Sequence, residues 1–174
     1  MTKIKEIKVI IPEFITHIPK SKNKYIKING QRIYSGLNHH LRSLLVRRIH
    51  NYLKPYIVSQ LKDKEVLKDL FPLKISLDFI APINYGSVQM RKNKNNKYTL
   101  RWKPPEKDYI PGWDADNQWI WGKCFNDVLK ELGYIKDDTV EYIKSSGEVN
   151  FIECENFKDR KLIFKLTKRN INGK

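Results

Sequence analysis

Three segments of the chain alternate apolar and polar residues with a period of two, the pattern of strands that bury one face. These segments are residues 5–11 (KEIKVII), 73–82 (LKISLDFIAP) and 160–167 (RKLIFKLT). Pro12 is expected to end the first segment, because proline has no N–H to donate to a strand ladder. The alternation therefore predicts a strand at each of these three places.

A fourth strand is expected at residues 139–153, bent or bulged near Gly147. We expect it to form a hairpin with the strand at 160–167 across Glu155–Asp159. The tail at residues 169–174 is expected to be frayed.

An earlier hairpin is predicted at Asn29-Gly30, since this dipeptide between alternating apolar residues is a strong hairpin signal. It should pair Tyr25–Ile28 with Arg32–Ser35, after a basic turn at Pro19–Lys24.

Helical spacing of apolar residues predicts a long amphipathic helix from Leu37 to about Gln60, broken near Pro55. The apolar stripe of this helix consists of Leu41, Leu44, Leu45, Ile49, Tyr52 and Leu53. Its outer surface is basic and carries Arg42, Arg47, Arg48 and Lys54. We expect the arginines of this surface to contact a DNA backbone.

A second helix is predicted after Asn117, which can serve as its N-cap, and Gly133 is placed for its C-terminal turn. Its apolar stripe consists of Trp121, Phe125, Val128, Leu129 and Leu132. The combined pattern predicts an α+β fold: residues 1–174 form a single small domain, with a mixed or antiparallel sheet packed against two main helices.

Residues 83–113 are poor in core residues and are expected to form a long basic insertion, with a short hairpin at Tyr98–Lys103. A loop of this length in a compact domain is usually functional or disordered. Its basic residues, which suit a phosphate backbone, are Arg91, Lys92, Lys94, Lys97, Arg101 and Lys103. Tyr98 and Trp102 lie among them and could stack on bases. The alternative is a solvated loop that contacts nothing.

The net charge of the chain indicates what kind of partner the protein binds. The chain of 174 residues has 34 Lys and Arg against 19 Asp and Glu, a net charge of +15. This excess favours a polyanion, with nucleic acid ahead of an acidic membrane surface or protein. A Lys-rich solvated surface is the plainer alternative. The two cysteines are too few for a disulfide framework, no apolar run could span a membrane, and the N-terminus lacks a signal-peptide pattern. We therefore expect a cytoplasmic protein.

The segment DADNQWIWGKCFNDVLKELGYIKDD, residues 114–138, carries the candidate chemistry. Asp114 and Asp116 lie on one side of an extended chain and end where the second helix begins. Asp138 follows that helix, and a strand end, a helix start and the next strand's start can lie close together. Three carboxylates offer the hard oxygen ligands that Mg²⁺ prefers. Acid-bound Mg²⁺ in a basic protein suggests phosphodiester hydrolysis.

Lys123 on the second helix could stabilise transition-state charge on the scissile phosphate. The alternative is a surface ion pair with Asp127, four residues away on the same helical face. Taken alone, Asp114–Asn117 reads as a helix cap and the Asp137–Asp138 pair as an acidic turn. The joint spacing of these residues is what favours a site.

The spaced pattern D-x-D-N, then K-x-x-F-x-D-x-L-x-x-x-G-x-x-x-D-D, is carried by Asp114, Asp116, Asn117, Lys123, Phe125, Asp127, Leu129, Gly133, Asp137 and Asp138. It resembles the RusA family of Holliday junction resolvases, which are common in phages and prophages. The likeness extends to the expected order of strands and helices from residue 5 onward. One departure is that the family lysine sits closer to D-x-D-N: here about three extra residues, nearly one helical turn, intervene within Gln118–Gly122. A second departure is the length of the insertion at 83–113.

The resemblance implies a homodimer that binds four-way DNA junctions and cuts them with Mg²⁺, for which Mn²⁺ can substitute. It assigns metal binding and catalysis to Asp114, Asp116 and Asp138, and charge stabilisation to Lys123. We expect Asp137, Asn117 and Asp127 to hold these residues in place. The alternative for Asp137 is that it caps the next strand. No membrane and no small-molecule cofactor are expected.

Two other functions remain open from the sequence. A non-catalytic protein that binds branched DNA would use the same basic surface and keep its acids for structure. A nuclease could also prefer flaps or forks over four-way junctions. A D-x-D nucleotide-sugar transferase fits poorly, because the chain is short and has no recognisable nucleotide-binding segment.

Overall fold

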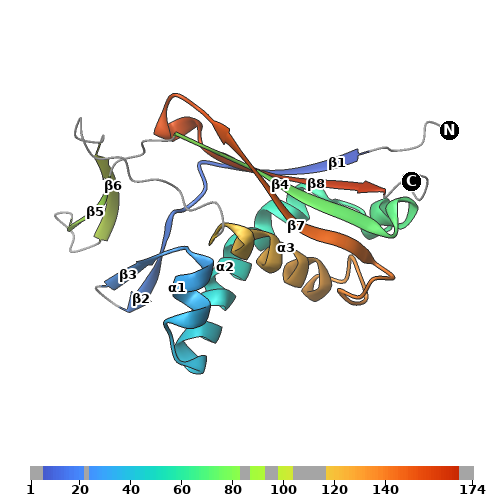
Figure 1. Cartoon of the computed structure of the whole chain (residues 1–174), viewed down its shortest axis with the longest axis horizontal. Helices are drawn as coiled ribbons and strands as arrows, with labels where there is room; N and C mark the ends of the chain where they lie inside the picture. Colours follow the sequence, from blue (N-terminus) through green and yellow to red (C-terminus); the bar gives the residue numbers. More distant parts are fainter. Residues whose placement is uncertain (1–5, 22–23, 83–86, 93–97, 104–116, 169–174) are drawn as a thin grey trace.

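The computed structural model describes residues 6–21, 24–82, 87–92, 98–103 and 117–168, and it describes no side chains between 83 and 116. Within these ranges the chain is a small α+β domain with a mixed sheet and several helices (Figure 1). The elements in chain order are β1 (Glu6–Pro12), β2 (His17–Ser21), β3 (Lys24–Lys27), α1 (Gly30–Ser35), α2 (His39–Gln60), η1 (Lys64–Leu70), β4 (Leu73–Ala81), β5 (Ser87–Lys92), β6 (Tyr98–Lys103), α3 (Trp119–Glu131), β7 (Ile143–Glu153), η3 (Phe157–Asp159) and β8 (Lys161–Lys168).

The main sheet has the strand order β1-β8-β4-β7. β8 pairs antiparallel with both β1 and β4, whereas β4 and β7 are parallel. The parallel pair requires a long crossover, and α3 lies in the chain between those two strands. The three strands predicted from alternation are confirmed, and their alternate residues are buried on one face.

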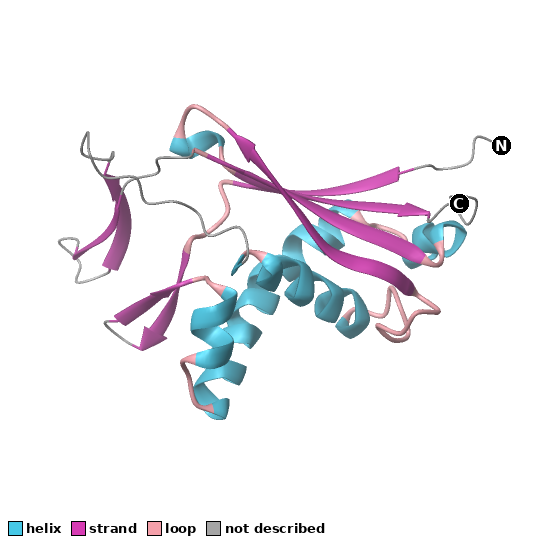
Figure 2. Cartoon of the chain, in the orientation of Figure 1, coloured by secondary structure: helices cyan, strands magenta, loops and turns pink. Residues whose placement is uncertain are grey.

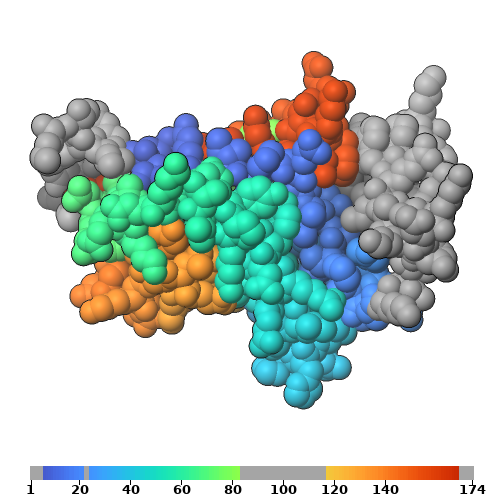
Figure 3. All heavy atoms as spheres, turned by 180° about the vertical axis from the view of Figure 1, so that it is seen from behind, coloured from blue at the N-terminus to red at the C-terminus, as the bar shows by residue number. Residues whose placement is uncertain are grey.

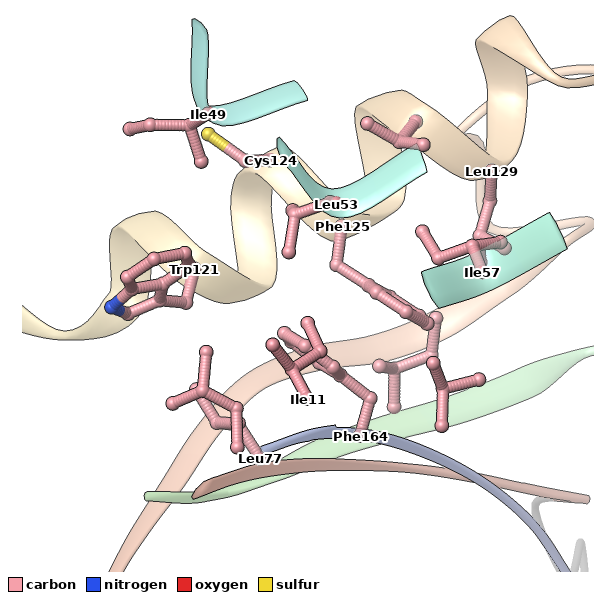
Figure 4. Packing of buried hydrophobic residues seen from close by; sticks show 14 of the residues in the cluster. Ile11, Ile49, Leu53, Ile57, Leu77, Trp121, Cys124, Phe125, Leu129 and Phe164 are labelled. Atoms are coloured by element: carbon pink, nitrogen blue, oxygen red, sulfur yellow. The ribbon is translucent and has the colours of Figure 1, made fainter. Parts of the chain in front are cut away.

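α2 and α3 cover the same face of the sheet, and the core lies between them and the strands (Figure 2). The predicted stripe of α3 is confirmed by four fully or almost fully buried residues, Trp121, Phe125, Val128 and Leu129. Phe125 stacks on Phe164 of β8, with ring centroids 4.0 Å apart and planes 8° apart (Figure 4). This packing fixes the direction of α3 across the sheet.

α2 begins at His39, where the side chain of Asn38 accepts a hydrogen bond from the Leu41 N–H at 2.9 Å. The expected break near Pro55 is wrong, because α2 continues to Gln60. Buried Leu53 and Ile57, on either side of the proline, hold the helix against the core. Leu44 is 40% exposed and does not belong to the buried stripe.

The expected hairpin at Asn29-Gly30 is also wrong. β3 pairs with β2 instead, and the chain after Asn29 forms α1. Asn29 has an extended backbone (φ −154°, ψ 126°), and its side chain accepts from the Arg32 N–H at 2.8 Å, as a helix N-cap does. In the view from behind, the junction of α1 and α2 projects from the body of the molecule (Figure 3).

β7 and β8 do not form the expected hairpin, because β4 lies between them. β7 also begins later than expected: residues 139–142 form a turn in which the Thr139 carbonyl accepts from Tyr142 and Ile143. The irregularity near Gly147 is confirmed, since the β4–β7 register shifts there and Gly147 has φ +92°.

The short hairpin expected at Tyr98–Lys103 is wrong in its bounds, because these residues form one strand, β6, which pairs antiparallel with β5. The remaining residues of the expected insertion, and the tail at 169–174, lie outside the described residues. Across the described residues, no helix is long and apolar enough to cross a membrane.

Candidate metal site and nucleic-acid surface

The acidic motif enters the described structure at Asn117, because Asp114 and Asp116 lie outside the described residues. The Asn117 side chain is buried, and its Oδ1 accepts a hydrogen bond from the Gln31 N–H of α1 at 2.9 Å. Asn117 is therefore not the N-cap of α3 that the sequence suggested. Gln118 occupies that position, without a side-chain capping bond.

α3 begins in close contact with α1. A Cβ on Gly30 would lie 2.6 Å from Cε2 of the Trp119 indole, closer than packed atoms come. The Trp119 ring also packs against Tyr34, with centroids 5.2 Å apart. Together with the Asn117–Gln31 hydrogen bond, these contacts fix the start of α3 to the N-terminal end of α1.

Lys123, the candidate catalytic lysine, forms an ion pair with Asp127 in which Nζ and Oδ2 are 3.5 Å apart. The Lys123 side chain is 43% exposed, and Asp127 also faces His50 of α2, with Nε2 and Oδ2 3.7 Å apart. The surface ion pair expected as the alternative for Lys123 is thus present. The pair holds the Lys123 ammonium on the outer face of α3, and the catalytic role of Lys123 stays a prediction.

His50 connects α2 to α3 through two carboxylates. Its Nδ1 is 2.6 Å from Oε1 of Glu131, whose other oxygen is 2.7 Å from Nζ of Lys54. Burial alone would lower the pKa of His50, but Asp127 and Glu131 outweigh burial and raise it. In turn, His50 is the largest cause that lowers the pKa of Asp127, and Lys123 adds to it. These charged groups hold α2 and α3 together at the solvent edge of their interface.

Asp137 and Asp138 lie beyond the C-terminal end of α3 and both face Lys130 of its last turn. The Lys130 ammonium contacts Asp137 directly and is 3.7 Å from Asp138 Oδ1. Lys130 is the largest cause that lowers the pKa of Asp137, and the Asp138 N–H, which donates to the Asp137 carboxylate at 2.9 Å, is the next. Asp137 thus holds the backbone at Asp138, and its role in supporting a metal ligand stays a prediction.

The expectation that the helix start and Asp138 lie close together is wrong. α3 has 13 residues and extends about 20 Å at 1.5 Å per residue. Asn117 precedes its first residue, and Asp138 is 3.7 Å from Lys130 in its last turn. The two ends are separate because the apolar face of α3 spans the sheet, which keeps the helix straight across the core.

The donor chemistry at Asp138 fits a magnesium ion, because its exposed carboxylate offers hard oxygen ligands. Among the described residues, no three His, Cys, Asp or Glu side chains are grouped closely enough to hold a metal. Two of the three expected ligands, Asp114 and Asp116, are outside that range, so the metal site stays a prediction.

A hollow of about 420 Å³ lies beside the anchored start of α3. Its lining residues come from the end of β3 and from α1: Lys27, Asn29, Gln31, Arg32, Ser35 and Gly36. Two of them are cationic and none is acidic. Gln31, whose N–H binds Asn117, links this hollow to the end of the D-x-D-N motif.

The basic residues expected to contact DNA have different surroundings. Arg42 Nη1 donates to the Tyr34 carbonyl at 3.3 Å, and Arg48 Nη1 donates to the Pro19 carbonyl. Arg47 is exposed on α2. The side chains of the six basic residues between 91 and 103 lie outside the described side chains, so their contacts stay predictions.

Sequence reasoning missed three residues of this region: His50, Lys27 and Arg32. His50 directly follows the stripe residue Ile49, which gave no sign that it faces two carboxylates of another helix. Lys27 and Arg32 flank Asn29-Gly30 and were placed in a hairpin. Reading Asn29 as a helix cap would have brought Arg32 to the first turn of a helix.

Comparison with known proteins gives no match: no family model, curated protein or solved structure matches this chain. The resemblance to the RusA family therefore rests on the residues of the motif itself.

Proposed function

We propose that the protein is a Mg²⁺-dependent, structure-specific endodeoxyribonuclease that cuts branched DNA, with four-way junctions as its substrate. The observation that carries this proposal is the anchoring of Asn117, which joins the D-x-D-N motif to a hollow that contains Lys27 and Arg32. Asn117, the last residue of the motif, thus lies next to a hollow whose cations suit a phosphate. A protein of net charge +15 also attracts DNA.

In this proposal Asp114 and Asp116, which precede the start of α3, hold one Mg²⁺ ion, and Asp138 beyond its end holds a second, or Mn²⁺ takes their place. The metal supplies activated water and neutralises charge on the scissile phosphate. Lys123 presents its ammonium on the outer face of α3, where Asp127 restrains it. It would stabilise negative charge that develops on the phosphate oxygens.

A homodimer is part of the proposal. Resolution of a four-way junction requires two cuts on opposing arms, and a two-fold symmetric pair of chains would present two equivalent sites to a symmetric substrate. The biological setting would be recombination, repair or phage DNA processing in the cytoplasm.

A second function is favoured by a specific observation. Asp138 is paired with Lys130 and lies at the opposite end of α3 from Asn117. If these acids serve only to stabilise the fold, the protein binds branched DNA through its basic surface and cuts nothing. The two functions differ in one result, the appearance of a metal-dependent product.

The test is to incubate the purified protein with labelled four-way junction, flap, fork and linear duplex, with and without Mg²⁺ or Mn²⁺, and to map the cuts. We expect paired nicks in the junction that require metal. Asp114→Asn and Asp138→Asn should abolish cutting and leave junction binding within about twofold. Asp69→Asn, an exposed acid on η1, is the matched control and should cut normally. Full cutting by either site variant would refute the assignment, and binding without any product would establish the second function.

A further inference from the structure

The hollow beside α1 has the composition of an anion site. Its two charged side chains, Lys27 at the end of β3 and Arg32 in the first turn of α1, are both cations. The other lining residues include Ser35 and Gln31, which can donate hydrogen bonds, and both are exposed. Among the residues that the structure describes, no carboxylate lines the hollow.

The backbone amides of α1 do not make this site. The Gln31 N–H donates to Asn117, and the Arg32 N–H donates to Asn29, so these two amides of the first turn already have acceptors. Anion binding would therefore depend on the Lys27 and Arg32 side chains themselves. This makes the hollow testable by substitution of side chains without disturbance of the helix.

His17 on β2 lies within the electrostatic field of the same two cations. Burial, followed by the charges of Lys27 and Arg32, lowers the pKa of His17 to about 4. The imidazole is therefore neutral at neutral pH, and its Nδ1 lies 2.9 Å from the Thr16 hydroxyl. Two cations strong enough to disfavour a third in their neighbourhood favour an anion by the same electrostatics.

We propose that this hollow binds a phosphate group through Lys27 and Arg32; on the function proposed above, it is a backbone phosphate of the DNA substrate. The guanidinium of Arg32 can bind two phosphate oxygens at once, and the Lys27 ammonium supplies a second positive charge. The volume of about 420 Å³ leaves room for the sugars on either side of the phosphate. A phosphate held here would lie next to the end of the D-x-D-N motif, through the Asn117–Gln31 contact.

The experiment measures binding alone, so that it does not depend on catalysis. Fluorescence anisotropy with a labelled four-way junction in EDTA compares the wild-type protein with Lys27→Ala/Arg32→Ala. The control is Lys62→Ala/Lys144→Ala, which removes the same charge from exposed lysines elsewhere on the fold. Lys62 follows the end of α2, about 33 Å along that 22-residue helix from its start near α1.

We expect the hollow variant to bind the junction about tenfold more weakly, whereas the control stays within about twofold of wild type. The slope of log K against log salt should also decrease by about one in the hollow variant, as expected for the loss of one phosphate contact. Arg32→Lys alone should fall between these variants, because it keeps the charge but not the two-oxygen geometry. Thermal unfolding of each variant should match wild type, since Arg32 is exposed and Lys27 half-buried.

A second arm identifies the source of the phosphate. Inorganic phosphate and a short single-stranded oligonucleotide are each titrated into the junction complex as competitors. If the hollow binds backbone phosphate, the oligonucleotide competes at much lower phosphate concentration than inorganic phosphate does, and only with the wild-type hollow. Preferential competition by inorganic phosphate would show a site for free phosphate and would overturn the assignment to DNA.

Equal loss of affinity in the hollow and control variants would overturn the inference, because charge alone would then explain binding. The two proposals can also fail separately. A protein that cuts junctions but binds them independently of Lys27 and Arg32 is a nuclease without this phosphate site. A protein that binds through the hollow but never cuts has the phosphate site without the nuclease activity.

Discussion

The close approach of α1 to α3 at Gly30 can be tested by adding one methyl group. In Gly30→Ala, the new Cβ would lie 2.6, 2.7 and 2.9 Å from three atoms of the Trp119 indole. Indole is rigid and is packed against Tyr34, so it cannot turn away at low cost. Overpacking of this kind costs about 1–3 kcal/mol. Alanine at the start of a helix offsets part of that cost, by at most about 1 kcal/mol.

The net expectation for Gly30→Ala is a loss of about 1 kcal/mol, which for a domain of this size lowers the Tm by about 2–4 °C. Gly122→Ala is the matched control in α3. A Cβ at Gly122 would have no neighbour within 4 Å among the described residues, and Gly122 lies inside the helix. Alanine there should stabilise the protein by about 0.4–1 kcal/mol, with a higher Tm.

The assay is thermal unfolding of the three proteins by circular dichroism, together with the NMR signal of the Trp119 indole N–H. We expect opposite Tm shifts for the two variants and a displaced indole signal only in Gly30→Ala. A Tm for Gly30→Ala equal to or above that of wild type would refute the close packing of α1 on α3. A loss of stability in Gly122→Ala would instead show that the space beside α3 is filled.

Two further predictions concern the ends and the interface of α3. The raised pKa of His50 means that its pairing with carboxylates stabilises the fold fully below the unfolded pKa of about 6.5 and less as pH rises through the folded pKa. His50→Gln should therefore lower the urea midpoint of unfolding more at pH 6 than at pH 8. An equal loss at both pH values would contradict the pairing. Gly133 has φ +75°, so Gly133→Ala should lower the free energy of unfolding by about 1–2 kcal/mol. Urea unfolding measures this loss, and Gly36→Ala is the comparison variant, because Gly36 has no positive φ. An unchanged midpoint in Gly133→Ala would show that the turn has another conformation.

The elements that local pattern alone determines were predictable. The alternation in β4 and β8 and the apolar stripe of α3 each result from one face of the element packing on the core. The end of α3 was also predictable from Gly133. The N–H groups of Gly133 and Tyr134 donate to the carbonyls of Lys130 and Leu129, as in a helix that ends on a left-handed glycine.

The errors arose where a distant segment decides between two local structures. Asn29-Gly30 is compatible with a hairpin turn and with a helix cap. Trp119 and Asn117, almost ninety residues later, pack on and hydrogen-bond to this segment once it is helical. The prediction of a β7–β8 hairpin is wrong for a similar reason. β4 pairs with β7 along one edge and with β8 along the other, so it lies between them. No short-range signal carries that preference.

The candidate site divides in the same way. The Lys123–Asp127 pair follows from a spacing of four on one helix, so the sequence predicts it. His50 and Lys54 reach Asp127 and Glu131 from α2, and this contact depends on the crossing of two helices. Helix crossing is set by packing against the sheet, which periodicity does not reveal.

The pairing of Asp138 with Lys130 bears directly on whether Asp138 can bind a metal. Lys130 directly contacts Asp137, whereas its 3.7 Å distance to Asp138 is at the long end of an ion pair between exposed side chains. Exposed pairs of this length contribute little, because water screens both charges. A divalent cation at Asp138 would therefore displace a weak contact, and Lys130 would keep its partner in Asp137. Asp137, the first aspartate of the pair, thus has a structural use, since it occupies the lysine and leaves the Asp138 carboxylate available.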